Sequence, residues 1–267
     1  MRRLLLPLVS AALVWTPPAH AQTSSDAPVP IEEWSQERVS TLGRRIYLHD
    51  RAAWLATEAL RETLTADEID QVEGWIVTEA ADGLRVRFAR EADGVLVPGW
   101  DVPVGDSAGP VSAVETGSLF SATELAQFAA RQTAAREIGA LRCSREMNSV
   151  VFEDPDGGGW LVWLLAASTE RGVIPVGGHY RFRVSADGST LLRRDQLSNG
   201  CLNMRDDRRG PNGQRAGLVV THIVSDGPVE THVFLSLLNR TPVYVAADDK
   251  LIAVEGDRIR FVQTLED

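Results

Sequence analysis

The chain has 267 residues, of which 44% are hydrophobic and 24% are charged. This composition is that of a globular protein and excludes the disordered and fibrous classes. The formal net charge of -10 argues against a nucleic-acid-binding protein, because such proteins need a basic surface to neutralise phosphates. Two cysteines are too few for a zinc ribbon or a disulfide-rich scaffold.

The first 21 residues have the parts of a secretory signal peptide. Arg2 and Arg3 give a basic start, an apolar stretch of signal-core length follows, and residues 19–21 (Ala-His-Ala) match the small-x-small cleavage pattern. No other stretch has enough apolar residues to span a bilayer. We therefore expect a periplasmic or secreted protein with no membrane span after cleavage.

Residues 22–34 are rich in Ser, Pro and Ala, and they predict a flexible leader. Apolar residues then recur at spacings of three, four and seven, which predicts a helix over residues 35–64. Thr65 and Glu68 form a capping-box pattern for a second, short helix. Residues 74–78 and 84–89 predict a hairpin, and the prolines and glycines of residues 92–112 predict a loop.

A second unit is expected over residues 116–267, after an N-terminal unit over residues 35–115. Ser121 and Glu124 form another capping-box pattern, which predicts a helix ending near Leu141. Short strands are expected after it, at residues 149–152, 160–167, 180–185, 190–194, 218–224, 230–237, 243–246, 251–254 and 258–262. The order predicts an α+β fold of two helix-then-antiparallel-strand units followed by a C-terminal β-meander.

Residues 120–196 resemble exported PepSY-like or cystatin-like modules. The resemblance rests on a helix followed by antiparallel strands that end in Tyr-Arg-Phe-Arg-Val-Ser-Ala-Asp-Gly-Ser-Thr-Leu-Leu, residues 180–192. It covers less than a third of the chain and carries no catalytic residues across. Such modules act as binding or inhibitory domains, so the resemblance implies a binding function.

Cys143 and Cys201 are the two cysteines of the chain. In an oxidising compartment an isolated pair predicts a structural disulfide, and the absence of a C-x-x-C spacing argues against a redox-active role. We expect the bridge to connect the end of the second long helix with the loop after the 180–194 hairpin.

The 180–194 hairpin gives the strongest candidate site. With Asp187-Gly188 as a two-residue turn, Arg181 lies opposite Arg194, and one exposed face gathers the predicted ligand-binding residues His179, Arg181, Arg183 and Arg194. The positive charges of Arg181 and its neighbours then need nearby negative charge or solvent, because like charges on paired strands repel. Either the chain's own carboxylates or water compensate them, or the face binds an anionic small molecule or an acidic peptide segment.

The histidines supply an alternative function. His222 and His232 are expected near opposite ends of a hairpin that turns at residues 226–227. If Val224 faces Val229, they project to opposite faces and are poor partners for one metal ion, whereas a register shifted by one residue brings them onto one face. The chain has no G-x-S-x-G, S-x-x-K or H-E-x-x-H motif and no phosphate-cradling glycine loop, so no metal or cofactor is expected. The sequence favours an exported binding protein for an envelope protein, a peptide or an anionic ligand. The alternative is an envelope hydrolase with His179, His222 or His232 as general base, which a histidine hydrogen-bonded to Ser, Asp or Glu in a cleft would favour.

Overall fold

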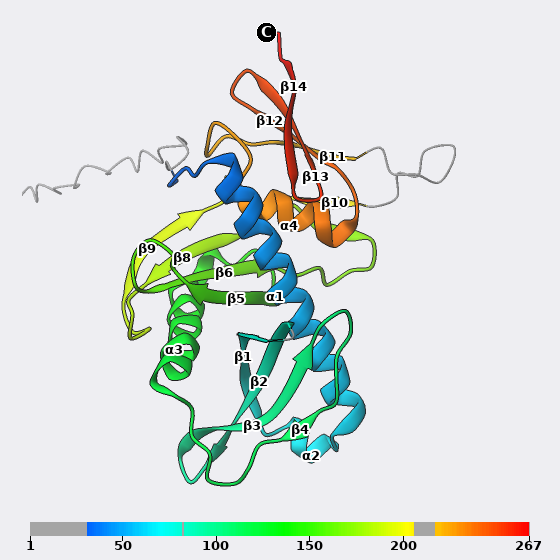
Figure 1. The fold of residues 1–267 in the computed structure, drawn as a ribbon. Helices are drawn as coiled ribbons and strands as arrows, with labels where there is room; N and C mark the ends of the chain where they lie inside the picture. The colour runs from blue at the N-terminus through cyan, green and yellow to red at the C-terminus, as the bar shows by residue number, and fades with distance from the viewer. Residues whose placement is uncertain (1–30, 82, 206–216, 267) are drawn as a thin grey trace, which may run out of the picture.

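The computed structural model describes residues 31–81, 83–205 and 217–266. The predicted signal peptide, residues 1–21, and residues 22–30 of the predicted leader lie outside these ranges. The described part confirms an α+β fold with four helices and several antiparallel sheets (Figure 1). Within it, none of the helices combines the length and apolar character needed to cross a membrane.

Helix α1 (Gln36–Thr63) is the axis on which the rest of the fold packs (Figure 1). It begins where predicted, because the Ser35 hydroxyl accepts the backbone N–H of Arg38 as an N-cap. The first half of its apolar face packs with the central and C-terminal strands, and the second half packs with the N-terminal sheet. Helix α1 thus contributes residues to two hydrophobic clusters.

The N-terminal sheet follows α1 and the short helix α2 (Ala66–Ile69), whose capping box between Thr65 and Glu68 is formed as predicted. It is antiparallel and its strands pair in chain order, β1 (Val72–Ala80), β2 (Gly83–Ala92), β3 (Val95–Val104) and β4 (Ser112–Ala113). The predicted hairpin is the pair β1–β2.

The loop predicted over residues 92–112 is wrong, because the whole of β3 lies in it. Pro98 is tolerated at a bulge, where Trp100 pairs with Phe88 and Pro98 pairs with Ala89, so that one extra residue interrupts the ladder. Pro103 lies beyond the two β3 residues that pair with β4, so its missing N–H breaks no bond on that side. The proline content therefore predicted too long a loop, because Pro98 and Pro103 both occupy positions at which a strand tolerates proline.

Helix α3 (Ala122–Glu137) joins the N-terminal sheet to the central one. The central sheet has the order β5 (Met147–Glu153), β6 (Trp160–Ala166), β8 (Tyr180–Val184) and β9 (Leu191–Gln196), all antiparallel. The Gln127 side chain donates to the carbonyls of Val77 in β1 and Val151 in β5, at 3.0 Å each. One buried amide thus satisfies carbonyls from two sheets.

The C-terminal sheet differs from the predicted meander. Strand β11 (Leu218–Thr221) pairs parallel with β12 (Val243–Ala247), and only β13 (Lys250–Glu255) and β14 (Arg258–Thr264) continue antiparallel. Parallel strands need a crossover, and helix α4 (Glu230–Asn239) provides it where residues 230–237 were predicted as a strand. Helix α4 crosses α1 at Gly43, where a Cβ atom would lie 2.4 Å from that of Val233.

The sequence missed α4 because its start lacks the usual capping residues. The residue before the helix is Val229, which has no side chain that can cap. Its backbone N–H instead donates to Nδ1 of His232 at 3.0 Å. In a capping box a Glu or Gln side chain accepts this N–H. The helix is also buried on most sides, so its apolar residues do not show a helical period.

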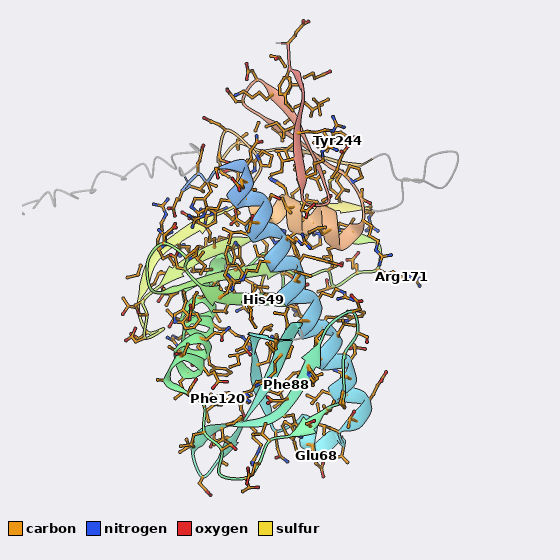
Figure 2. The ribbon with its side chains drawn as sticks, viewed as in Figure 1. His49, Glu68, Phe88, Phe120, Arg171 and Tyr244 are labelled. Carbon is orange, nitrogen blue, oxygen red and sulfur yellow. A yellow bond between two sulfur atoms is a disulfide. The ribbon has the colours of Figure 1, made fainter. Side chains whose placement is uncertain are left out.

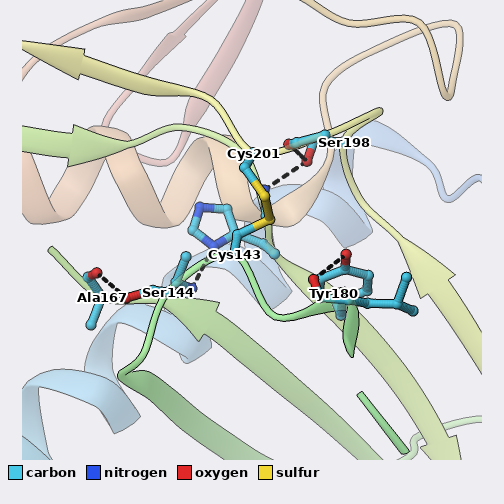
Figure 3. Close-up of a disulfide and its surroundings, with 11 residues drawn as sticks. Cys143, Ser144, Ala167, Tyr180, Ser198 and Cys201 are labelled. Carbon is cyan, nitrogen blue, oxygen red and sulfur yellow. Dashed lines mark hydrogen bonds between the residues drawn. A yellow bond between two sulfur atoms is a disulfide. The ribbon is translucent and has the colours of Figure 1, made fainter. Parts of the chain in front are cut away.

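The predicted disulfide is present between Cys143 and Cys201 (Figure 3). It connects the segment after α3 with the start of β10 (Asn203–Arg205), which pairs with β7 (Val173–Pro175). Neighbouring backbone is held by the Ser198 hydroxyl, which accepts from the Gly178 N–H at 2.8 Å (Figure 3).

Candidate functional site

The arginine hairpin β8–β9 forms, but its register differs from the predicted one. Near the turn Val184 lies opposite Leu191 as expected. Leu192 is then an extra residue in β9, and this bulge moves every later pair by one position. Arg194 therefore lies opposite Phe182, and Arg181 lies opposite Asp195.

The bulge removes Arg194 from the predicted site. Its guanidinium lies on the α3 side of the sheet and donates to the carbonyl of Glu137. That side is the apolar one that the alternation predicted, with Tyr180, Phe182 and Val184 packed on α3. The prediction of one face with His179, Arg181, Arg183 and Arg194 is wrong for Arg194, because a one-residue shift moves a side chain to the opposite face.

The opposite face of β8 and β9 is covered and not exposed as predicted. His179 is only 2% exposed and Arg181 is 3% exposed, whereas Arg183 is partly exposed. We call this surface the arginine face and define it by Arg181, Arg183 and Arg193. Carboxylates of the chain cover it, so the compensation that the like charges required is internal.

Arg181 is the centre of the arginine face. Its guanidinium bonds Asp195 Oδ2 at 2.8 and 3.0 Å and Glu230 Oε1 at 3.0 Å. Asp195 is 5% exposed and Glu230 is fully buried. Trp163 Nε1 donates to the same Glu230 oxygen at 2.8 Å. Burial of this kind is favourable only when every charge is paired and hydrogen-bonded.

The two flanking arginines also meet carboxylates. Arg183 bonds Asp154 Oδ2 at 2.6 Å and lies 3.2 Å from a carboxylate oxygen of Glu32. Arg193 bonds Asp195 Oδ1 at 2.8 Å from a more exposed position. Three guanidinium groups therefore face four carboxylates, which leaves the arginine face without excess positive charge.

The end of the predicted leader is the outermost layer of this site. We call residues 31–34 (Ile-Glu-Glu-Trp) the strap. The carbonyl of Glu32 accepts from Arg181 Nη2 at 2.7 Å, and the ring of Trp34 lies 3.7 Å from the Arg181 guanidinium carbon. Ile31 is 7% exposed and belongs to the central core. Ile31 is buried and Glu32 and Trp34 are half-buried, while the exposed Glu33 is held by a hydrogen bond, so this segment is not a free leader.

The strap has a third anchor at the loop before α4. Oε1 of Glu33 accepts the backbone N–H of Asp226 at 3.1 Å. The guanidinium of Arg38 also lies over the Trp34 ring, with its guanidinium carbon 4.3 Å from the ring centroid. Cation–π contacts of this kind are strongest where the cation is partly desolvated, as both arginines are here.

The histidines are internal. Nδ1 of His179 accepts the N–H of Ala166 at 3.1 Å, and its Nε2 lies 3.1 Å from the carbonyl of Pro175. These bonds use both ring nitrogens, so His179 holds backbone and cannot serve as the expected ligand-binding residue without breaking them. Burial lowers the pKa of His179 to about 4.

His222 and His232 are brought together by the β11–α4 connection. Their ring centroids are 4.8 Å apart, in an edge-to-face arrangement, in place of the separated positions predicted for a hairpin. Burial lowers the pKa of His222 to about 4 and places that of His232 well below its usual value. Nε2 of His222 lies 2.7 Å from the Ser225 hydroxyl. Among the described residues, no group of three or more His, Cys, Asp or Glu is arranged to hold a metal ion.

His49 lies on α1 beside the central sheet (Figure 2). Its ring contacts Phe152 edge-on at 5.4 Å, and the pKa of His49 is lowered to about 3, mainly by burial and also by the charge of Arg45. The adjacent Asp50 is buried and accepts from Asn148 at 3.0 Å, and burial raises its pKa to about 6.

Sequence reasoning missed the carboxylates of the site, and it also missed Arg193 and Trp34. Asp195 was hidden by the bulge, Glu230 by the missed helix, and Trp34 by the composition of the leader around it. Trp34 had one local signal, because a tryptophan directly before a capping serine is unusual in a free segment, and large aromatic side chains are seldom left unpacked.

The fold and site define an α+β protein with a buried arginine–carboxylate centre under the strap. In searches of protein-family models, curated proteins and solved structures, nothing matches this chain.

Proposed function

We propose that the chain is an exported binding protein, periplasmic or secreted, whose arginine face binds an extended acidic peptide segment of an envelope partner. The proposal is supported mainly by the way in which the strap binds to the arginine face. A short extended segment with two glutamates and a tryptophan lies on Arg181 and Arg183 through one carbonyl, one carboxylate and one aromatic ring. The strap is thus an occupant, supplied by the chain itself, of a peptide site.

A peptide fits this face better than a free inorganic anion does. The arginines already meet Asp154, Asp195 and Glu230, so a small anion finds little positive potential. A peptide adds a backbone hydrogen bond to Arg181 and an aromatic ring stacked on a desolvated guanidinium, and neither needs excess charge.

Several sequence features support the export and binding parts of the proposal. The first 21 residues have the order of a signal peptide, and the paired cysteines suit an oxidising compartment. The resemblance of residues 120–196 to PepSY-like or cystatin-like modules also favours binding. The partner segment replaces the strap, which competes at the high effective concentration that a tether gives.

The test is binding of a fluorescein-labelled peptide with the sequence of residues 28–36, measured by anisotropy. Trp34→Ala in the full chain weakens the competing strap and leaves every residue of the sheet unsubstituted. We expect this variant to bind the peptide with a Kd at least about tenfold lower than the unsubstituted chain, because the intramolecular competitor has lost its stacked ring.

Trp54→Ala is the matched control, since Trp54 is 61% exposed on the second half of α1. We expect it to bind the peptide as the unsubstituted chain does. A peptide in which the residue equivalent to Trp34 is alanine should not bind either variant. Absence of saturable binding to the Trp34→Ala chain up to about 1 mM peptide would contradict the proposal.

A further inference from the structure

The connection from β11 to α4 contains a serine–histidine pair. Ser225 Oγ lies 2.7 Å from His222 Nε2, within the range expected between a nucleophile and its base. The same hydroxyl lies 2.9 Å from the carbonyl of Gly227, so its one proton has two acceptors in reach. His222 is 4% exposed, while Ser225 is half-buried.

The pair borders a cavity of about 710 Å³. The cavity lies where the parallel strands β11 and β12 end, and α4 begins beyond it. Ligands of sheets with parallel strands and crossover helices bind at the carboxyl ends of the strands. Apolar side chains share the lining with the pair, among them Ile223, Val224 and Leu265.

We propose that Ser225 and His222 form a nucleophile–base pair that hydrolyses small carboxylic esters in this cavity. The proposal does not require peptide binding at the arginine face, although Glu33 of the strap also borders this cavity. In the alternative function, that of a hydrolase, Ser225 is the nucleophile, His222 is the base and this cavity is the substrate site.

The reaction balances with water as the only co-reactant. Ser225 Oγ attacks the ester carbonyl carbon while its proton moves to His222 Nε2. The C–O bond to the alcohol breaks, and the alcohol leaves with that proton. Water then attacks the acyl-serine and gives one proton to His222, which returns it to Ser225 Oγ as the carboxylic acid departs.

The backbone N–H of Asp226 is the candidate donor for the carbonyl oxygen. It follows the nucleophile directly, and it already donates to a negatively charged oxygen, Glu33 Oε1, at 3.1 Å. Glu33 also lines the cavity. The Glu33 carboxylate therefore occupies the position that a developing oxyanion needs, and it has to move for the reaction to proceed.

The ring of His222 is uncharged above about pH 5, since burial holds its pKa near 4, and it can accept a proton. Among the described residues no carboxylate hydrogen-bonds its Nδ1; the nearest ring is that of His232. A pair without a third, orienting carboxylate, with a base of low pKa, predicts slow turnover.

The experiment is covalent labelling of the purified full chain by a small alkyl fluorophosphonate, followed by intact mass and peptide mapping, together with hydrolysis of p-nitrophenyl acetate. We expect one adduct per chain, on Ser225. Ser225→Ala should lose the adduct and the esterase rate, and His222→Gln should slow labelling by about 100-fold or more. Glu33→Ala should label faster than the unsubstituted chain, because the Asp226 N–H becomes free.

Ser189→Ala is the matched control, an exposed serine of the β8–β9 turn whose hydroxyl bonds Asp187. It should label as the unsubstituted chain does. No adduct on the unsubstituted chain, under conditions that fully label a known serine esterase, would overturn the proposal. An adduct that persists in Ser225→Ala, or labelling equally fast in His222→Gln, would overturn it as well.

Discussion

Replacing Arg181 with alanine should lower the free energy of unfolding by about 3–5 kcal/mol. The substitution leaves Glu230 and Asp195 without their guanidinium partner at positions that are 0% and 5% exposed. Glu230 is affected most, because its other carboxylate oxygen is buried without a hydrogen-bond partner among the described residues. Urea unfolding followed by tryptophan fluorescence measures the loss.

Arg193→Ala is the matched control for this prediction. Arg193 bonds the same Asp195, but its side chain is 43% exposed. An exposed partner of this kind contributes no more than about 1 kcal/mol, so the loss should be several times smaller than for Arg181→Ala. Equal losses for both variants would contradict a buried centre at Arg181.

A double substitution separates the lost ion pair from lost packing. Arg181→Met keeps most of the side-chain volume and leaves Glu230 charged and unpaired. Adding Glu230→Gln removes that buried charge, and we expect the double variant to be more stable than Arg181→Met alone. A double variant less stable than the single one would show that the Glu230 charge is not the source of the loss.

Acidification from pH 7 to pH 5 should lower the free energy of unfolding by about 6 kcal/mol. The pKa values of His49, His179 and His222 are lowered to about 3, 4 and 4, and that of His232 lies well below normal, in each case mainly through burial. The unfolded chain then binds more protons than the folded one below about pH 6.5, so stability falls as pH falls. Between pH 7 and pH 5 each histidine contributes slightly less than about 2 kcal/mol, because part of its effect is already present at pH 7.

Asp50 acts in the opposite direction. Burial raises its pKa to about 6. Between about pH 4 and 6 the Asp50 carboxyl is therefore protonated in the folded chain and ionised in the unfolded chain. Acidification to pH 5 therefore restores about 1 kcal/mol through Asp50, and the histidines outweigh it. The expected total is comparable with the whole stability of an ordinary domain, so unfolding near pH 5 is the predicted outcome.

Urea unfolding at half-unit steps from pH 7 to pH 5 measures this dependence. His222→Gln removes one of the four titrating groups while its side-chain amide can still reach the Ser225 hydroxyl. Its stability should fall with a slope about one quarter smaller than that of the unsubstituted chain. A free energy of unfolding that stays level between pH 7 and pH 5 would contradict the burial of uncharged histidines.

Local sequence signals predicted the parts of the fold that local physics determines. Helix α1 was predicted because apolar residues recur at helical spacing along it, and the structure adds the Ser35 cap at its start. Cys143 and Cys201 were predicted to pair because the sequence pattern predicts an oxidising compartment and two cysteines allow one intramolecular pairing. The turn-proximal register of β8–β9 was predicted because the turn fixes it.

The candidate site could not be predicted fully, because it depends on events without a local signal. Leu192 bulges from β9, which replaces Arg194 with Asp195 opposite Arg181. Glu230 reaches the site only because residues 230–239 form a helix, at whose start the N–H of Val229 donates to Nδ1 of His232. These contacts are tertiary, and neither composition nor periodicity encodes them.

The most direct test of the central claim is whether a peptide displaces the strap from the arginine face. ¹⁹F NMR of the full chain with 5-fluorotryptophan gives one resonance for Trp34, assigned through Trp34→Phe. Adding the unlabelled peptide of residues 28–36 should move this resonance saturably from its stacked position to that of a free tryptophan, while the Trp54 resonance stays unchanged. A Trp34 resonance that does not move at saturating peptide, or that moves only together with Trp54, would contradict strap exchange at the arginine face.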